Sequence, residues 1–509
     1  MSHFKSQAGR PSLPPPALFF YHHVPKNLFL IWLSLISLPF SIAVVIASYV
    51  VSFIDSKPKR TPTYTAKTPK TILVTGVSMT KGLTIARLLC RYTPHRIIGA
   101  DIEPTALSLS PGRFSRSLDK FYTLAAPDGE DTEPYVDALL SLLKNEQVDL
   151  WISCSSVVSA IEDGQVMRLA SSVLGSKFHA VQFGEDVVER LHSKDAFIDY
   201  IKSLELPVPE SHRCTSASEV HGILSSVREE EGKGKAKKRF LMKPMGVDDR
   251  ARNSMMTLLP LKTPEDTSNH VATLRVSTEN PYILQQFIDS PEYCTHALVV
   301  RGKVKAFVAC PSSELLMHYK ALSPASKLSR AMLEFTRRVA GDGGEDFSGH
   351  LSFDFLVEEK GDEVMLWPIE CNPRAHTAVI LFENVPEMAA AYLSVFEEDI
   401  GEKHVDKDPV APKMPCYSYY WVGHDLVYFV LIPFMELLHG IRTYRDVQDE
   451  FRTFFNHLLY WRDGTFTVWD PLPWLALYHL YWPGQFLNAI INGVGWSRIN
   501  VSTTKVFEL

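Results

Sequence analysis

Acidic and amide side chains gather around two short apolar segments in the middle of the chain. The stretch from Gly349 reads GHLSFDFLVEE, and after the turn KGD it continues EVMLWPIECNPR. Apolar and polar residues that alternate on both sides of a short turn predict a β-hairpin. Antiparallel pairing would bring Asp354 and Glu370 to one edge, with Asn372 just beyond. Two carboxylates and an amide oxygen are hard-oxygen ligands that suit Mg²⁺.

An arginine, Arg374, follows this cluster two residues after Asn372. Its planar guanidinium can bind a phosphate or a carboxylate through two parallel hydrogen bonds. An ordinary solvent-facing hairpin would not explain why an acid, an amide and an arginine meet at the end of one apolar strand. The residue types therefore predict a site that holds magnesium and an anion together.

The pattern D-x-F…E-C-N-P-R resembles the metal-binding end of the ATP-grasp family. In that family an acid on one strand and a Glu-x-Asn on the next hold two magnesium ions. The resemblance implies that Asp354, Glu370 and Asn372 bind two Mg²⁺ ions, with Mn²⁺ as a possible substitute.

Three upstream segments resemble further parts of the family's pattern, in the same order: HSKDAFIDYIKSLELPVPES from His192, RFLMKPMG from Arg239, and YILQQFIDSPEY from Tyr282. The resemblance implies that Lys194 and Lys243 contact the phosphates of ATP. It also implies nucleotide contacts in a hinge between two lobes. The adenine would lie against Gln285, Gln286, Phe287 and Ile288, and the ribose hydroxyls would bind Glu292.

The chain departs from the family in the loop after Lys243. Members usually close a glycine-rich loop over the phosphates there, whereas this chain has MGVDDRARNSMM, with Gly246 as its one glycine. Arg250 and Arg252 would either supply positive charge to the phosphates or be solvated. His350 and His376 lie near the acidic cluster in sequence, where they would either aid proton transfer or be packed and hydrogen-bonded.

The resemblance implies an ATP-dependent ligase that joins a small-molecule carboxylate to an amine. The carboxylate would attack the γ-phosphate of ATP, and an amine would then attack the resulting acyl phosphate to give an amide, ADP and phosphate. Lys243 and Arg374 would be catalytic. D-alanine–D-alanine ligase and carnosine synthase belong to this carboxylate–amine class. Carboxylation of an amine through carboxyphosphate is the alternative within the family.

The elements that must position these residues follow an α/β pattern. TILVTG from Thr71, KGLTIARLLCRY and HRIIGADIEP alternate strand with helix, which predicts a parallel, doubly wound sheet. We expect a Rossmann-like pre-grasp domain over 71–185, followed by a two-lobed α+β ATP-grasp domain over 186–405.

The first of these strands ends in a glycine motif with a second interpretation. Gly76, Gly82 and Asp101 could bind a dinucleotide, because glycines allow close approach of a phosphate and an acid can hold a ribose hydroxyl. This would make the chain an NAD(P)-dependent oxidoreductase. The stretch GVSMTKG lacks a third glycine, however, and a structural turn explains it as well.

A long uncharged segment precedes the α/β region. Residues 27–54 read NLFLIWLSLISLPFSIAVVIASYVVSFI, which is long enough to cross a bilayer. We expect a transmembrane helix over 27–54, a disordered proline-rich tail over 1–26 and a linker over 55–70. The basic cluster after the helix predicts a single-pass membrane protein with its catalytic part in the cytosol. A re-entrant turn at Pro39 is the alternative. This architecture suits a eukaryotic biosynthetic enzyme, fungal by hypothesis.

The last region, 406–509, is aromatic-rich and is expected to be mainly helical. Six of the nine tryptophans lie there, which suits either a membrane interface or a core that packs on the catalytic domain. The net charge of −6 argues against nucleic-acid binding, and seven scattered cysteines suit a reducing compartment. A catalytically silent membrane scaffold is the remaining alternative.

Overall fold

The computed structural model describes most of the chain, in ranges separated by short gaps. These ranges are 23–54, 62–64, 68–103, 105, 108–127, 131–154, 156, 159–232, 238–245, 257–312, 317–361, 363–397 and 408–508. Residues 1–22 of the predicted tail, most of the linker and the loop with Gly246, Arg250 and Arg252 lie outside the described residues. Residues 23–26, predicted as part of the disordered tail, are helical instead and begin the apolar helix four residues before its predicted start.

A five-stranded sheet forms the first α/β unit, and all of its strand pairs are parallel, as predicted. The strand order is β3-β2-β1-β4-β5. The β-branched run of β1 is buried because neighbouring strands and helices surround it. The strands are β1 (Thr71–Thr75), β2 (Arg96–Ile102), β3 (Lys120–Leu124), β4 (Leu150–Ile152) and β5 (His179–Val181). The helices are α3 (Thr80–Tyr92), η1 (Pro111–Phe114), α4 (Glu133–Asn145), α5 (Ala160–Leu174) and η3 (Gly175–Lys177).

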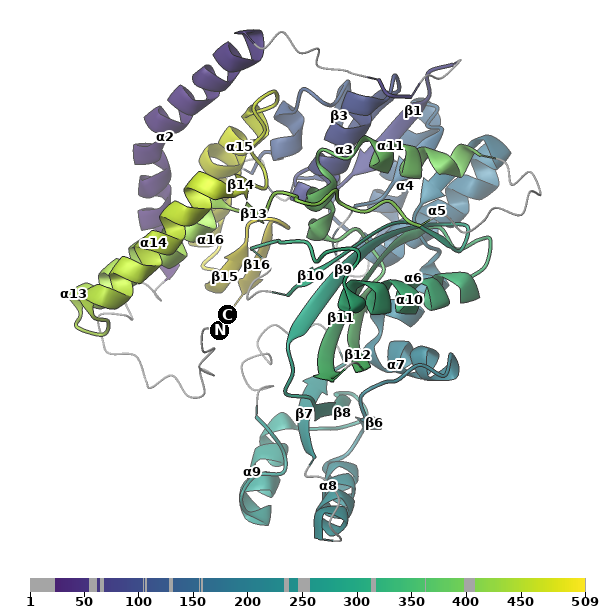
Figure 1. Ribbon diagram of the computed structural model, residues 1–509, viewed down its shortest axis with the longest axis vertical. Coiled ribbons are helices and arrows are strands. Elements are labelled where there is room, and N and C mark those ends of the chain that lie inside the picture. The colour runs from purple at the N-terminus through teal and green to yellow at the C-terminus, as the bar shows by residue number, and fades with distance from the viewer. Residues whose placement is uncertain are drawn as a thin grey trace.

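A small antiparallel sheet of order β6-β8-β7 forms a separate lobe with two helices, at the bottom of Figure 1. Its elements are β6 (Ser211–Cys214), α8 (Ala217–Gly232), β7 (Arg239–Pro244), α9 (Pro264–Leu274) and β8 (Tyr282–Phe287).

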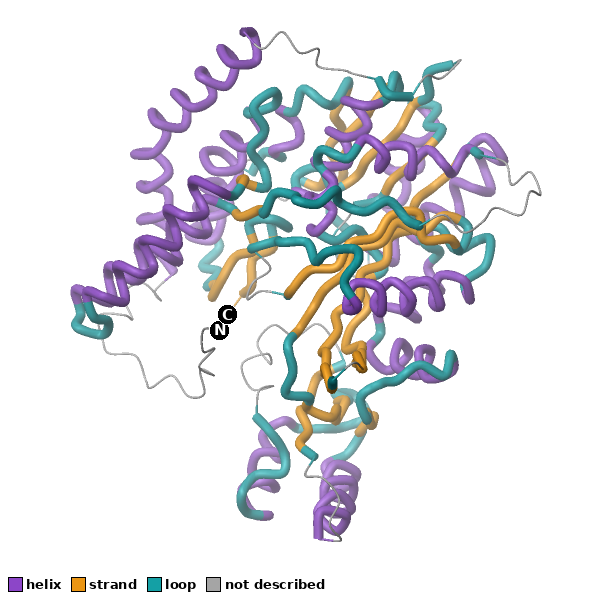
Figure 2. The backbone as a smooth tube through the Cα atoms, in the orientation of Figure 1, coloured by secondary structure: helices purple, strands orange, loops and turns teal. Residues whose placement is uncertain are grey.

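A larger antiparallel sheet of order β10-β9-β11-β12 lies between this lobe and the parallel sheet (Figures 1 and 2). Its strands are β9 (Glu292–Val300), β10 (Lys303–Pro311), β11 (Gly349–Lys360) and β12 (Glu363–Asn372). The accompanying helices are α6 (Glu185–His192), α7 (Lys194–Ser203), α10 (Lys327–Asp342), η6 (Thr377–Phe382), α11 (Pro386–Leu393) and η7 (Ser394–Phe396).

The C-terminal region is mainly helical, as predicted. Two π-helical turns, η8 (Leu426–Leu431) and η9 (Leu477–Tyr481), each lie just before a proline, Pro433 or Pro483. Proline has no N–H and its ring crowds the preceding turn, which accounts for the widened turns. The other elements are β13 (Tyr419–Tyr420), α12 (Val422–Asp425), α13 (Ile432–Leu438), α14 (Tyr444–Tyr460), β14 (Arg462–Asp463), α15 (Leu472–Ala476), α16 (Trp482–Ile491), β15 (Trp496–Asn500) and β16 (Lys505–Glu508).

The inner side of this region packs on the parallel-sheet unit. The guanidinium of Arg87 in α3 donates to Asp470 Oδ2 at 2.9 Å and to the carbonyl of Thr465 at 2.9 Å. Asp470 also accepts hydrogen bonds from Ser115 and the backbone of Arg116. This buried network joins residues more than 350 positions apart, so the inner side of the C-terminal region packs on the α/β part of the chain.

The apolar N-terminal segment forms helix α2 (His23–Ile54), which is 32 residues long. It is the one helix among the described residues that is long and apolar enough to cross a membrane. The helix lies alongside the C-terminal region and contacts α15, η9 and α16 (Figure 1).

Candidate active site

The acidic hairpin has the predicted antiparallel register. Asp354 in β11 lies directly opposite Glu370 in β12, and Ser352 lies opposite Asn372. The neighbours of Asp354 in β11, Phe353 and Phe355, point the other way into the core. The alternation of the strand therefore places the acids on one face and the aromatic rings on the other.

Three polar atoms at the end of this hairpin are buried without a hydrogen-bond partner among the described residues. They are Asn372 Oδ1, Arg374 Nη1 and Ser352 Oγ, and Ser352 lies opposite Asn372. The amide nitrogen of Asn372 makes a long contact of 3.4 Å to Asp354 Oδ2, so its oxygen is left for another ligand. Buried polar groups are usually satisfied, and orphaned ones need an explanation. An oxygen acceptor beside two carboxylates fits Mg²⁺, and a guanidinium N–H fits a phosphate or carboxylate oxygen.

The charges of the cluster are poorly compensated by the protein alone. Burial and the neighbouring charges of Glu370 and Glu292 raise the pKa of Asp354 well above its usual range. Burial lowers the pKa of Arg374, although Glu370 and Asp354 oppose that change. A bound divalent cation would favour the ionised carboxylates, because it would be the largest local charge.

The two predicted phosphate-binding lysines face the same region from different elements. Lys243 lies on β7, and its ammonium donates to Gln285 Oε1 at 2.7 Å. Burial lowers the pKa of Lys243, Glu370 raises it and Lys194 lowers it. Lys194 is the first residue of α7. These electrostatic effects indicate that Lys194 and Glu370 lie close to Lys243.

The predicted adenine-binding residues lie where the small lobe joins the larger sheet. Gln285 does not present a free side chain, because it also donates to Ser211 Oγ at 3.1 Å. The backbone N–H of Gln286 donates to the carbonyl of Glu210 at 2.7 Å. Phe287 ends β8 and Ile288 is buried in the connection that follows. Glu292, at the start of β9, accepts a hydrogen bond from Ser312 Oγ at 2.8 Å.

Lys81 is a residue of this site that the sequence interpretation missed. It is 3% exposed and lies in the first turn of α3. Burial and the nearby cation of Arg374 lower the pKa of Lys81 to about 7, against the opposing effects of Asp163 and Asp101. A lysine in the first turn of a helix opposes the helix dipole, and that was the available signal in the sequence.

Three buried histidines lie close enough to Lys81 for its charge to lower their pKa values. His350 shares a hydrogen bond of 2.9 Å with the hydroxyl of Tyr392, and His376 Nδ1 accepts from the N–H of Ala378. Burial and Lys81 lower the pKa of each to about 3. The ring of His296 stacks on that of His350. These contacts describe packed, neutral imidazoles, which was one of the two predicted roles for His350 and His376.

Other groups of the protein contact the turn formed by the glycine motif after β1. Gly76 has φ +70°, and a Cβ on Gly82 would lie 2.3 Å from the Gly76 carbonyl oxygen. The carboxylate of Asp101 accepts the backbone N–H groups of Ser78 and Ile102. At the start of α3, the N–H of Thr80 donates to the Ser502 carbonyl at 2.9 Å. The motif therefore forms a tightly packed turn.

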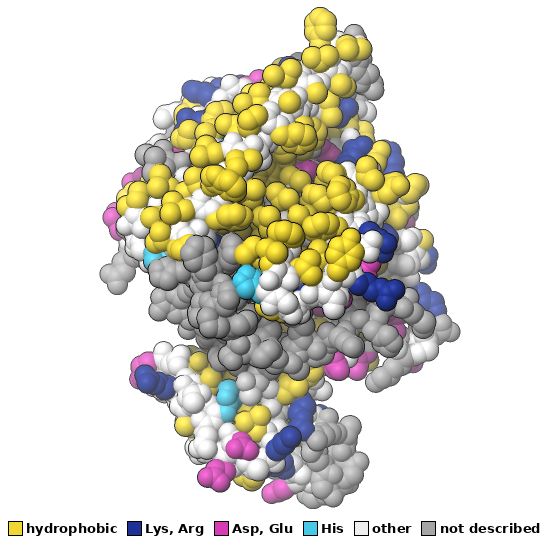
Figure 3. Space-filling view, turned by 90° about the vertical axis from the view of Figure 1, so that its left-hand side faces the viewer, with side chains coloured by type: hydrophobic (Ala, Val, Ile, Leu, Met, Phe, Trp, Pro, Cys, Tyr) yellow, Lys and Arg dark blue, Asp and Glu magenta, His cyan; other side chains and the backbone are white. Residues whose placement is uncertain are grey.

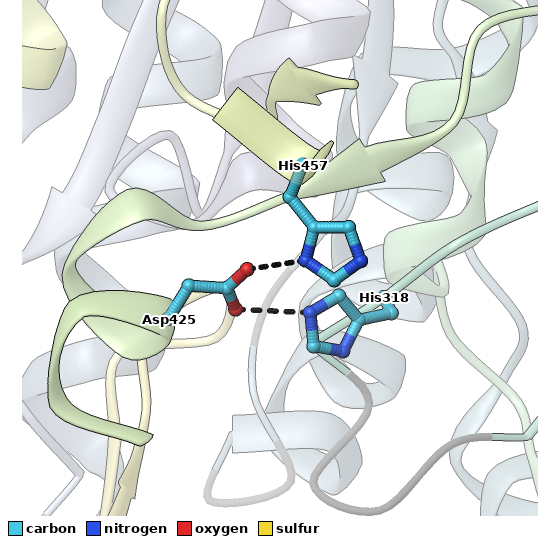
Figure 4. Close-up of side chains that lie close together, drawn as sticks. All are labelled: His318, Asp425 and His457. Carbon is cyan, nitrogen blue, oxygen red and sulfur yellow. Dashed lines mark hydrogen bonds and ion pairs between the residues drawn. The ribbon is translucent and has the colours of Figure 1, made fainter. Parts of the chain in front are cut away.

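A second cluster of potential metal ligands joins His318, between β10 and α10, to Asp425 and His457 of the C-terminal region (Figure 4). Asp425 Oδ1 is 2.9 Å from His318 Nε2, and Asp425 Oδ2 is 2.6 Å from His457 Nδ1. Two imidazoles and a carboxylate are ligand types of zinc sites. Both carboxylate oxygens already have a partner, however, and these hydrogen bonds keep the pKa of Asp425 low despite its burial.

No protein-family model and no curated protein matches this chain. Among solved structures, the chain is similar to an L-amino acid ligase from Bacillus licheniformis, with 13% identity and a TM-score of 0.40 over 62% of this chain and 69% of that one. It is also similar to N5-carboxyaminoimidazole synthetase from Staphylococcus aureus complexed with ADP, with 12% identity and a TM-score of 0.44 over 63% and 74% of the two chains.

A third similar structure is the biotin carboxylase domain of the Hydrogenobacter thermophilus 2-oxoglutarate carboxylase, in complex with MgADP, ADP and bicarbonate. The identity is 14% and the TM-score 0.42, over 65% of this chain and 70% of that one. These similarities, with identities below 15% and TM-scores below 0.5, do not assign a function to this chain.

Proposed function

We propose that this chain is an ATP-dependent carboxylate–amine ligase that forms an amide through an acyl phosphate. The observation that carries the proposal is the end of the β11–β12 hairpin. There, an amide oxygen and a guanidinium N–H that have no partner among the described residues lie beside two opposed carboxylates. That donor set fits a nucleotide-bound cation on one side and an anionic substrate on the other.

The residues divide into three roles in this proposal. Asp354, Glu370 and Asn372 would hold two magnesium ions, which supply charge neutralisation at the β- and γ-phosphates. Lys194 and Lys243 would neutralise the remaining phosphate charge, while the hinge at 285–288 and Glu292 would bind the nucleoside.

The carboxylate substrate would attack the γ-phosphorus of ATP, which breaks its bond to the ADP oxygen and gives an acyl phosphate and ADP. The amine would then attack the acyl carbon, phosphate would leave, and the ammonium product would lose a proton. Arg374 would orient the carboxylate and stabilise the developing oxyanion. The buried Lys81 lies close enough to Arg374 for that cation to lower its pKa, and a lowered pKa suits a group that would bind or deprotonate the second substrate.

The domain assignments belong to the same proposal. The parallel sheet would be a Rossmann-like pre-grasp domain over 71–185, and the two antiparallel sheets would be the lobes of an ATP-grasp domain over 186–405. The strand order β3-β2-β1-β4-β5 supports the first assignment. The clustering of Lys243 and Glu370 from different sheets supports the second. The proposal also includes a role in small-molecule biosynthesis and attachment to a membrane through α2.

The oxidoreductase alternative is not favoured by the geometry of its own motif. Asp101 is held by backbone N–H groups, and the Ser502 carbonyl lies at the start of α3 where a dinucleotide phosphate would bind.

The test is release of ADP by the full-length chain in detergent, with Mg-ATP and pooled carboxylates and amines. We expect release that depends on both substrates and disappears in Glu370→Gln. Equal ADP release by this variant, or no stabilisation of the folded chain by Mg-ATP, would remove the ligase assignment.

A further inference from the structure

Helix α2 turns its polar residues toward the protein and its apolar residues outward, the reverse of a surface helix in a water-soluble protein. Asn27, Ser34, Ser41 and Ser48 recur every seven residues and lie on the side that faces the protein. Ser34 Oγ donates to the carbonyl of Tyr478 at 3.0 Å. Small and weakly polar residues at a helix–helix contact are typical of packing inside a membrane.

The outward side of α2 is apolar throughout. Phe40 is 73% exposed and Phe53 is 86% exposed, and other exposed residues include Leu28, Trp32 and Leu35. Figure 3 shows apolar side chains over a large part of this face of the molecule. Exposed side chains of the C-terminal helices include Phe434, Leu438, Phe455, Leu459, Leu480 and Ile491. Soluble monomers rarely expose contiguous apolar patches beyond a few hundred Å². This surface suits contact with the apolar part of a bilayer.

A cavity of about 440 Å³ lies between α2 and the C-terminal helices. Its walls are mainly aliphatic and aromatic, and include Leu33, Phe40, Val427, Leu458, Trp474 and Phe486. Both π-helical turns contribute to the lining, through residues such as Val427 in η8 and Tyr478 in η9. The volume is within the range of small-molecule sites.

The cavity has a basic end at the N-terminus of α2. Arg498 lines the cavity, is exposed, and stacks over the ring of Phe507. Lys26 lies over the ring of Trp496 and donates to its carbonyl. Long cationic side chains beside aromatic rings are typical of the polar boundary of a membrane.

The inner wall of the cavity adjoins the candidate active site at two places. Val501 lines the cavity, and the next residue, Ser502, shares a hydrogen bond of 3.2 Å with Thr377, three positions after Arg374. Val422 also lines the cavity, and the preceding Trp421 donates to the hydroxyl of Thr80, beside Lys81. Buried residues such as Trp421 and Ser502 therefore separate the cavity from the neighbours of Lys81 and Arg374.

We propose that one of the two ligation substrates is a single-chain amphiphile whose alkyl chain occupies this cavity. The chain would enter from the bilayer between α2 and the C-terminal helices, and its carboxylate or amine would reach the region between Arg374 and Lys81. This substrate assignment rests on the proposed ligase function, whereas the binding of an alkyl chain in the cavity does not.

Chain-length dependence tests the substrate assignment on the full-length chain. ADP release is measured with acetate, octanoate and palmitate in the presence of pooled amines, and with butylamine and hexadecylamine in the presence of pooled carboxylates. We expect KM in one of the two series to fall by up to about fourfold per methylene group. Ligase activity without chain-length dependence in either series would overturn the assignment.

A filled cavity is the matched test of location. Ser37→Phe places a ring in the cavity, whereas Ser52→Phe makes the same change on the same helix beyond the lining. We expect Ser37→Phe to abolish the preference for the long chain and Ser52→Phe to retain it. Val427→Trp, on the opposite wall, should act like Ser37→Phe and covers the case in which the first variant does not fold. Long-chain preference that survives both filling variants would contradict the location.

Photolabelling with a diazirine-bearing palmitic acid separates this inference from the ligase function. We expect saturable labelling of α2 and residues 422–432, retained in Glu370→Gln and lost in Ser37→Phe. If no ADP is released under any condition but this labelling pattern holds, the ligase proposal fails and the cavity assignment stands. Unsaturable labelling would overturn the assignment of the cavity as an alkyl-chain site for a substrate. Equal competition by phosphatidylcholine would also overturn it, because the cavity would then bind bilayer lipid.

Discussion

Two strand ends in this molecule place acidic side chains near the same buried region, and their hydrogen bonds differ. At the end of β2, the Asp101 carboxylate accepts two backbone N–H groups, and the adjoining helix start meets the Ser502 carbonyl. At the end of β12, Asn372 Oδ1 and Arg374 Nη1 are buried without a partner among the described residues. A satisfied acid holds a turn together, whereas an unsatisfied cluster has capacity for ligands.

The largest effect should come from Glu370→Gln, which keeps the size of the side chain and removes a metal-binding charge. We expect ADP release to fall at least about a hundredfold, because charge neutralisation at the transferring phosphate depends on the bound cation. Steady-state ADP assays measure this. Glu363→Gln, an exposed acid at the start of the same strand, is the matched control and should retain wild-type activity.

Lys243→Met should have the next largest effect. The loss of the cation that faces Glu370 across the lobes should raise KM for ATP and lower kcat, together by about ten- to a hundredfold. Lys238→Met is the matched control. Lys238 forms an ion pair with Glu210 and not with Glu370, so its loss should leave KM and kcat unchanged. If the two variants behave alike, Lys243 has no special role at the phosphates.

Asp101→Ala should lower stability and leave nucleotide binding intact, unlike the two preceding variants. It leaves the N–H groups of Ser78 and Ile102 without an acceptor, so the free energy of unfolding should fall by about 1–3 kcal/mol. Denaturant unfolding measures this change. Binding of Mg-ATP should be retained. Loss of nucleotide affinity with unchanged stability would mean that the β2 end, not the hairpin, is the nucleotide site.

The smallest effect concerns pH and Lys81. Its pKa is lowered to about 7 in the folded chain, so folding favours the neutral amine. The resulting stability is fully present above the unfolded-state pKa of about 10.4 and is lost as the pH falls through about 7. Wild-type Tm relative to that of Lys81→Met should therefore rise by a few degrees from about pH 6 to about pH 9. Parallel Tm profiles would show that Lys81 keeps its charge on folding.

The hairpin could be predicted from the sequence because its register depends on local alternation around a short turn. The same holds for the parallel sheet, since β1, α3 and β2 follow one another with clear periodicity. The burial of Lys81 could not be predicted, because the start of α3 is covered by Ser502 from the end of the chain.

The surroundings of α2 and the His318–Asp425–His457 cluster were equally out of reach. Ser34 and Tyr478 are 444 positions apart, and His318 and Asp425 are 107 positions apart. A hydropathy pattern reports that α2 is apolar, but it does not report which elements lie beside it. The seven-residue spacing of Asn27, Ser34, Ser41 and Ser48 indicates which side of α2 is polar, but not which element that side contacts.

The most direct test of the hairpin as the nucleotide–metal site is a titration of the full-length chain with Mn²⁺, followed by electron paramagnetic resonance, with and without a non-hydrolysable ATP analogue. We expect two bound ions per chain when the analogue is present, weaker binding without it, and loss of at least one ion in Glu370→Gln. Mn²⁺ binding that is independent of the nucleotide, or unchanged in Glu370→Gln, would contradict the assignment of Asp354, Glu370 and Asn372.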